Sequence, residues 1–137
     1  MITIRELSEL EIFDVDAYFG ALIDIMNVDG DAASKEGSFL RRQAESLGYN
    51  LAETVDFPPS FTAASLKDTS PVLRRIVIRD CIRMARVDNL YDDSEQKRIR
   101  ELAISLDVPV EDISAIEFWL DDYEALKIQE EKIFLES

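Results

Sequence analysis

Two acidic turns contain the residues of this sequence whose type and spacing could do chemistry. In each turn an aspartate is followed seven residues later by a glutamate, and further carboxylates lie nearby. Calcium and magnesium bind flexible oxygen ligands of this kind. The candidate metal ligands are Asp29, Asp31, Glu36, Asp88, Asp92 and Glu95. The spacing differs from that of an EF-hand, because counting from Asp29 puts Ala33 at loop position 5 and Leu40 at position 12.

The same carboxylates also suit a purely structural role. An aspartate in a turn accepts hydrogen bonds from nearby backbone amides, and a glutamate in the first turn of a helix is favoured by the helix dipole. Asp92 and Glu95 have the spacing of a capping box, with Asp in place of the usual Ser or Thr. The sequence leaves cation binding and helix capping open as two interpretations.

Composition excludes several classes of site and partner. The chain has no histidine and one cysteine, Cys81, so neither a zinc site of imidazole and thiolate ligands nor a histidine-based triad can form. The net charge of −14 repels nucleic acid and anionic lipid surfaces. No apolar run approaches the length of a membrane span, and we expect a cytoplasmic protein that does not insert into membranes.

Helical periodicity dominates the rest of the sequence. Apolar residues recur with a 3.6-residue period, and the helices that this predicts lie at about 15–26, 34–47, 71–87 and 92–106. Ser70 and Pro71 suit the start of the third helix, and Gly48 suits the end of the second. Apolar residues cover much of the circumference of the third helix, which predicts a central position for it.

The two helix pairs resemble each other at a separation of 59 residues. Residues 22–49 and 81–108 share eight identities in 28 positions, where chance would supply about two. The identities include Asp29 with Asp88 and Glu36 with Glu95. We therefore predict an internal duplication of one helix-turn-helix unit.

The resulting fold prediction is a single all-α domain over residues 1–137, a compact bundle of six or seven helices. No segment shows the sustained alternation of a strand. The first copy of the unit spans about 15–48 and the second about 71–107. A connector of about 49–70 is expected to hold one or two short helices, and a C-terminal helix is expected over about 110–136.

The two turn motifs resemble those of the TerB family of tellurite-resistance proteins, over residues 15–119. The matching residues are Val28-Asp29-Gly30 with Glu36, and Val87-Asp88-Asn89 with Glu95. The resemblance implies a compact fold of about seven helices, a role in tellurite resistance and wider stress responses, acidic clusters that hold a metal ion, and no known catalytic activity. Asn89 departs from the Asp-Gly pattern, which weakens the case for a metal role shared by both turns.

A basic stripe lies along the third predicted helix. It consists of Arg75, Arg79, Arg83 and Arg86. We expect these residues to pair with acidic side chains on neighbouring helices, and an anion site is the alternative. Arg83 is the local candidate partner of Asp80. Trp119 is expected to lie in the core, with a hydrogen-bond partner for its indole N–H.

These observations support two functional hypotheses, and a third, an acid–base or metal-assisted enzyme, would require two of these carboxylates to converge in a cleft. The first is a non-enzymatic stress-response module that binds a divalent cation or a basic partner through its acidic turns. The second is a helical protein–protein interaction scaffold, in which residues 124–137 dock on another copy or another protein and the turn carboxylates are structural. The partner's identity and the oligomeric state do not follow from the sequence.

Overall fold

Side-chain caps begin four of the helices in the computed structural model, which describes residues 1–28, 35–51, 59–87 and 91–135. The predicted start of the third long helix is confirmed, because Ser70 Oγ accepts a hydrogen bond of 3.1 Å from the Leu73 N–H and Pro71 follows the cap. The predicted capping box is also confirmed: Asp92 Oδ1 accepts from the Glu95 N–H at 2.8 Å, and the Glu95 carboxylate accepts from the Asp92 N–H.

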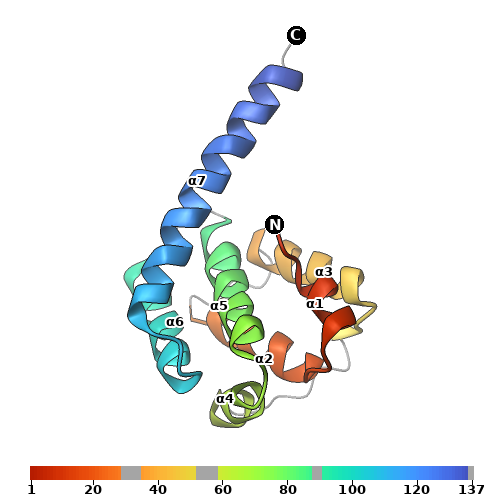
Figure 1. The fold of residues 1–137 in the computed structure, drawn as a ribbon, viewed down its shortest axis with the longest axis vertical. Helices are drawn as coiled ribbons and strands as arrows, with labels where there is room; N and C mark the ends of the chain where they lie inside the picture. Colours follow the sequence, from red (N-terminus) through yellow and green to blue (C-terminus); the bar gives the residue numbers. More distant parts are fainter. Residues whose placement is uncertain (29–34, 52–58, 88–90, 136–137) are drawn as a thin grey trace.

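The described residues form seven α-helices and no strand (Figure 1). They are α1 (Ile4–Leu10), α2 (Val15–Met26), α3 (Lys35–Leu47), α4 (Pro59–Lys67), α5 (Pro71–Arg86), α6 (Asp93–Ser105) and α7 (Val110–Phe134). The all-α prediction is therefore confirmed, and the predicted long helices match α2, α3, α5, α6 and α7 closely. Helix α1 was not predicted, although Thr3 caps it by accepting from the Glu6 N–H.

Helix α5 occupies the centre of the bundle, as predicted. It contacts α1, α2, α3, α6 and α7, and Figure 1 shows these helices arranged around it. Its fully buried apolar side chains are Leu73, Val77, Ile78, Cys81, Ile82, Met84 and Ala85. Burial of such side chains contributes roughly 1.5 to 3 kcal/mol each, so α5 supplies a large part of the hydrophobic stabilisation.

Helix α4 packs closely on α2 because α2 has a glycine at the contact. A Cβ atom added to Gly20 would lie 3.0 Å from Thr62 Oγ1, which is too close unless Thr62 moves. The connector helix thus rests against α2 at a position where a larger side chain would push the two helices apart.

Helices α3 and α6 end in the same way. Gly48 has a φ of 64° and Asp107, 59 residues later, has a φ of 56°. After α3 the Tyr49 N–H donates to the Ala44 carbonyl, and after α6 the Val108 N–H donates to the Ala103 carbonyl. Both ends therefore form a Schellman motif with a left-handed residue at the same place. This agreement favours the predicted repeat, whose evolutionary origin stays a prediction.

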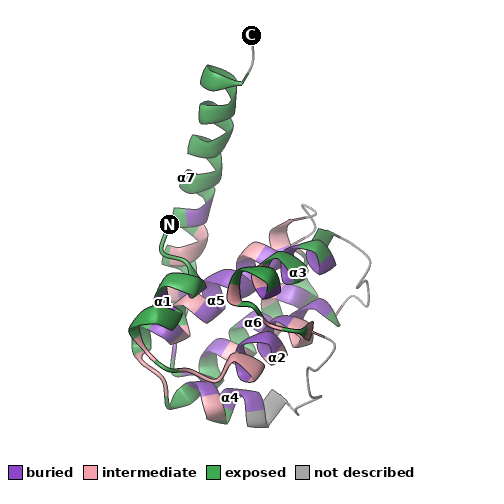
Figure 2. Cartoon of the chain, turned by 90° about the vertical axis from the view of Figure 1, so that its right-hand side faces the viewer, coloured by how far each residue is buried: buried purple, intermediate pink, exposed green. Residues whose placement is uncertain are grey.

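Helix α7 is far longer than the body of the domain requires. Its first turns pack on α5 and α6, and Ile113 and Leu120 are buried there. From Asp121 onward every described residue is exposed, and this part of the helix projects away from the other six helices (Figures 1 and 2).

Candidate functional site

The predicted acidic turns lie only partly within the described residues. Asp29, Asp31 and Asp88 fall outside them. Glu36 is fully buried in the first turn of α3. Within the described part of the chain, no three acidic or cysteine side chains come together in a group that could hold a metal ion. Cation binding by the turns therefore stays a prediction.

The two described carboxylates of the second turn are occupied in capping α6. Asp92 is exposed and holds the Glu95 N–H, while Glu95 is fully buried and reaches back to the Asp92 N–H. Such a box stabilises a helix by about 1 kcal/mol without any ligand. For Asp92 and Glu95, the structural interpretation of the sequence is the one that the geometry supports.

A buried ionic network occupies the face of α5 that meets α2 and α3. Asp80 is fully buried, and its carboxylate accepts from Tyr18 Oη at 2.8 Å and from Arg79 Nη2 at 2.9 Å. Arg83 Nη1 lies 3.2 Å from the same carboxylate, which confirms the predicted Asp80–Arg83 pair. Gln43 Nε2 donates to Tyr18 Oη at 2.9 Å. Burial and the adjacent Asp80 charge raise the pKa of Tyr18 well above its usual value.

The arginines of the predicted basic stripe take different partners. Arg79 and Arg83 pair with Asp80 on their own helix, so for them the prediction of partners on neighbouring helices was wrong. Arg86 does reach a neighbouring helix, because its guanidinium lies 2.7 Å from Asp121 and 3.8 Å from Glu117 on α7. The mixed outcome arises because Asp80 lies on the inward face of α5, where two arginines converge on it.

An exposed apolar stripe runs along one side of α7. Trp119, Tyr123, Leu126 and Ile133 recur at i, i+4, i+7 and i+14, which places them along one side of the helix. Trp119 is 44% exposed and stacks on Tyr123 with ring centroids 5.5 Å apart. The prediction that Trp119 lies in the core was therefore wrong. Leu126 and Ile133 are 64% and 65% exposed, and Phe118 and Ile128, which are 71% and 54% exposed, lie on other sides of the same helix.

The helix that carries this stripe is strongly acidic. Helix α7 contains eight acidic and two basic residues, so its formal charge is −6. None of the described helices combines the length and apolarity that crossing a membrane would require. An apolar stripe within an acidic helix is instead typical of a surface that another protein covers.

The predicted docking segment, residues 124–137, overlaps the exposed part of α7 and stays a prediction. The stripe starts at Trp119, inside the part of α7 that still packs on the body. The apolar residues that continue at helical spacing beyond Trp119, at Tyr123 and Leu126, were the signal in the sequence.

Comparisons of the chain with protein-family models, with curated proteins and with solved structures found no match. The resemblance to the TerB family thus rests on the two turn motifs alone.

Proposed function

We propose that the protein is an interaction module whose projecting helix α7 docks into an apolar groove with a basic rim on a partner protein. The observation that carries this proposal is the exposure of Trp119, Leu126 and Ile133 along one side of a helix that extends beyond its own domain. Helices recognised in this mode present anchors at i, i+4 and i+7, which is the spacing of Trp119, Tyr123 and Leu126.

Charge favours a different protein over a second copy as the occupant of this surface. Two α7 helices of charge −6 would repel each other, and the whole chain carries −14. A basic rim on the partner would instead speed encounter and fix the orientation of the helix. Docking would also stabilise residues 121–134, which are all exposed in the structure.

Site-specific photo-crosslinking in cells tests this proposal directly. A photoreactive amino acid replaces Leu126 or Ile133 in two variants, and the exposed Arg75 of α5 in a matched control. We expect positions 126 and 133 to crosslink to the same protein, whose crosslinked peptides line a groove rich in Lys and Arg, and position 75 to give no such product.

Two further measurements make the outcome decisive. Leu126→Glu should abolish the crosslink from position 133, because it places a charge in the apolar contact. High salt should weaken the complex, since its charges lie at an exposed rim. Crosslinks from 126 and 133 only to other copies of this chain, or to the same products as position 75, would contradict the proposal.

A further inference from the structure

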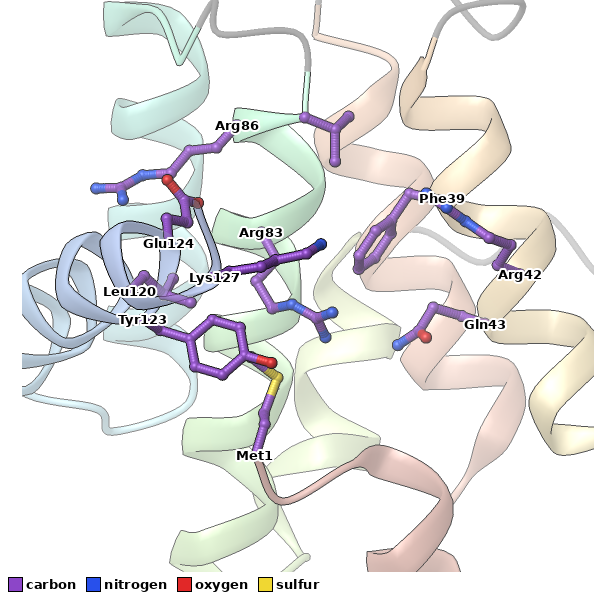
Figure 3. A pocket seen from close by; sticks show the side chains of 11 residues that line it. Met1, Phe39, Arg42, Gln43, Arg83, Arg86, Leu120, Tyr123, Glu124 and Lys127 are labelled. Atoms are coloured by element: carbon purple, nitrogen blue, oxygen red, sulfur yellow. The ribbon is translucent and has the colours of Figure 1, made fainter. Parts of the chain in front are cut away.

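A pocket of 390 Å³ lies where the base of α7 faces α3 across α5, with the start of the chain closing one side (Figure 3). Its volume falls in the range of small-molecule sites, about 300 to 1,000 Å³. It shares Tyr123 with the apolar stripe, whereas Leu126 and Ile133 do not line it. The sequence alone could not show it, because its walls come from segments more than 40 residues apart, such as Arg42 and Arg83.

Cationic groups from three helices meet in this pocket although the protein is strongly acidic. Arg42 comes from α3, Arg83 from α5 and Lys127 from α7. Figure 3 shows the Arg83 guanidinium and the Lys127 side chain directed into the space between α7 and α3. Glu124 is the one carboxylate in the lining. The fourth cation, Arg86, points away toward Asp121 and contributes little to the interior.

Charge pairing leaves much of this positive charge available. Arg83 donates one hydrogen bond, from Nη1 to Asp80, and its remaining N–H groups bond no other described residue. Arg42 and Lys127 form no ion pair with any residue that the structure describes. The ion pair with buried Asp80 fixes the position of the Arg83 guanidinium. The guanidinium is therefore preorganised for a ligand.

The remaining walls are aromatic and amide groups. Phe39 is buried, with the Arg83 guanidinium 5.1 Å from its ring centroid, and Tyr123 faces the pocket from the opposite helix. Gln43 adds an amide on the α3 side of the pocket, and its Nε2 already donates to Tyr18 Oη. Guanidinium and ammonium groups donate charge-assisted hydrogen bonds to the oxygens of a phosphate. The two rings can pack against a flat apolar group. We propose that this pocket binds a small phosphate monoester that carries an aromatic group.

Calorimetric titration of the full chain with phenyl phosphate tests the site. Lys127→Ala and Arg42→Ala should each weaken binding about tenfold, as expected for the loss of one charge-assisted contact. The matched control is Lys132→Ala, which removes an exposed lysine of the same helix outside the pocket. Leu126→Glu should leave the affinity within about twofold, because Leu126 does not line the pocket.

Two companion probes separate the phosphate from the ring. Phenol lacks the charge and inorganic phosphate lacks the ring, so both should bind at least about tenfold more weakly than phenyl phosphate. Circular dichroism of each variant checks that it is folded. The proposal is overturned by the absence of saturable binding up to about 10 mM phenyl phosphate. Equal affinity for phenol, or an equal loss in Lys132→Ala and Lys127→Ala, would overturn it as well.

Discussion

Replacing Asp80 with Asn should destabilise the domain more than almost any other single polar substitution. The Asp80 carboxylate is fully buried and accepts hydrogen bonds from Tyr18, Gln43, Arg79 and Arg83. Removing one partner of a buried ion pair costs about 3 to 5 kcal/mol, because the other charge stays buried without compensation. The charge left behind here is Arg79, whose side chain is 6% exposed. Since domains are stable by about 5 to 15 kcal/mol, the variant should lose a large part of its stability.

Urea unfolding followed by far-ultraviolet circular dichroism measures this loss. The midpoint should fall with little change in slope, and Asp68→Asn, at an exposed position, should stay within about 0.5 kcal/mol of the parent. The double variant Arg79→Met/Asp80→Leu should recover much of the stability, because it removes both charges together. A loss below about 1 kcal/mol in Asp80→Asn, or a double variant less stable than the single one, would refute the assignment of the cost to an uncompensated charge.

Three further outcomes follow from burial and capping. Cys81 should not react with a thiol reagent in the folded chain and should react on unfolding, because it is fully buried and burial raises the pKa of its thiol. Burial, with the nearby Glu117 charge, raises the pKa of Tyr91 to about 12, so its phenol ionises later than an unfolded tyrosine. The stability linked to Tyr91 is complete below about pH 10 and is lost as the pH rises through about 12, which urea midpoints and phenolate absorbance measured across that range would show. Asp92→Ala should cost about 1 kcal/mol in urea unfolding by removing the cap of α6, whereas Asp93→Ala, beside it and also exposed, should cost less.

The long helices could be predicted because their buried faces repeat every 3.6 residues. The same signal was too short at α1, where Ile4 and Leu7 are the only buried residues of a seven-residue helix. It was also misleading at Trp119, because a large apolar residue at helical spacing marks a buried face and a docking face equally well. Distinguishing the two requires knowing where the body of the domain ends along α7.

For the charged groups, the sequence predicted pairs within one helix but not contacts between helices. Helical spacing alone predicted the Asp80–Arg83 pair, since residues three apart are neighbours on a helix. It could not predict that Tyr18 and Gln43 meet the same carboxylate, because they come from α2 and α3. Nor could it predict that Lys127 faces Arg83 across the pocket. Contacts between distant segments depend on how the helices pack, which local periodicity does not contain.

The two predicted copies differ in the charged residues of the α5 face. The shared features, such as the Schellman ends after Leu47 and Ser105, serve the fold. The charged residues that fix and line the pocket have no counterparts 59 positions earlier. The pairs are Arg79 with Gly20, Asp80 with Ala21, Arg83 with Asp24 and Arg86 with Asn27.

The contrast is clearest at Gly20 and Arg79. The glycine leaves room for α4 against α2, whereas the arginine at the equivalent place on α5 holds Asp80 and donates to the Ile2 carbonyl, tying the start of the chain to the pocket wall. In the predicted alignment of the two copies, this position gives room for helix packing in α2 and an ion pair with Asp80 in α5. Because binding sites are built on folds by side chains that the fold itself does not require, the α5 face and the helix that covers it are where a ligand or partner is expected to act.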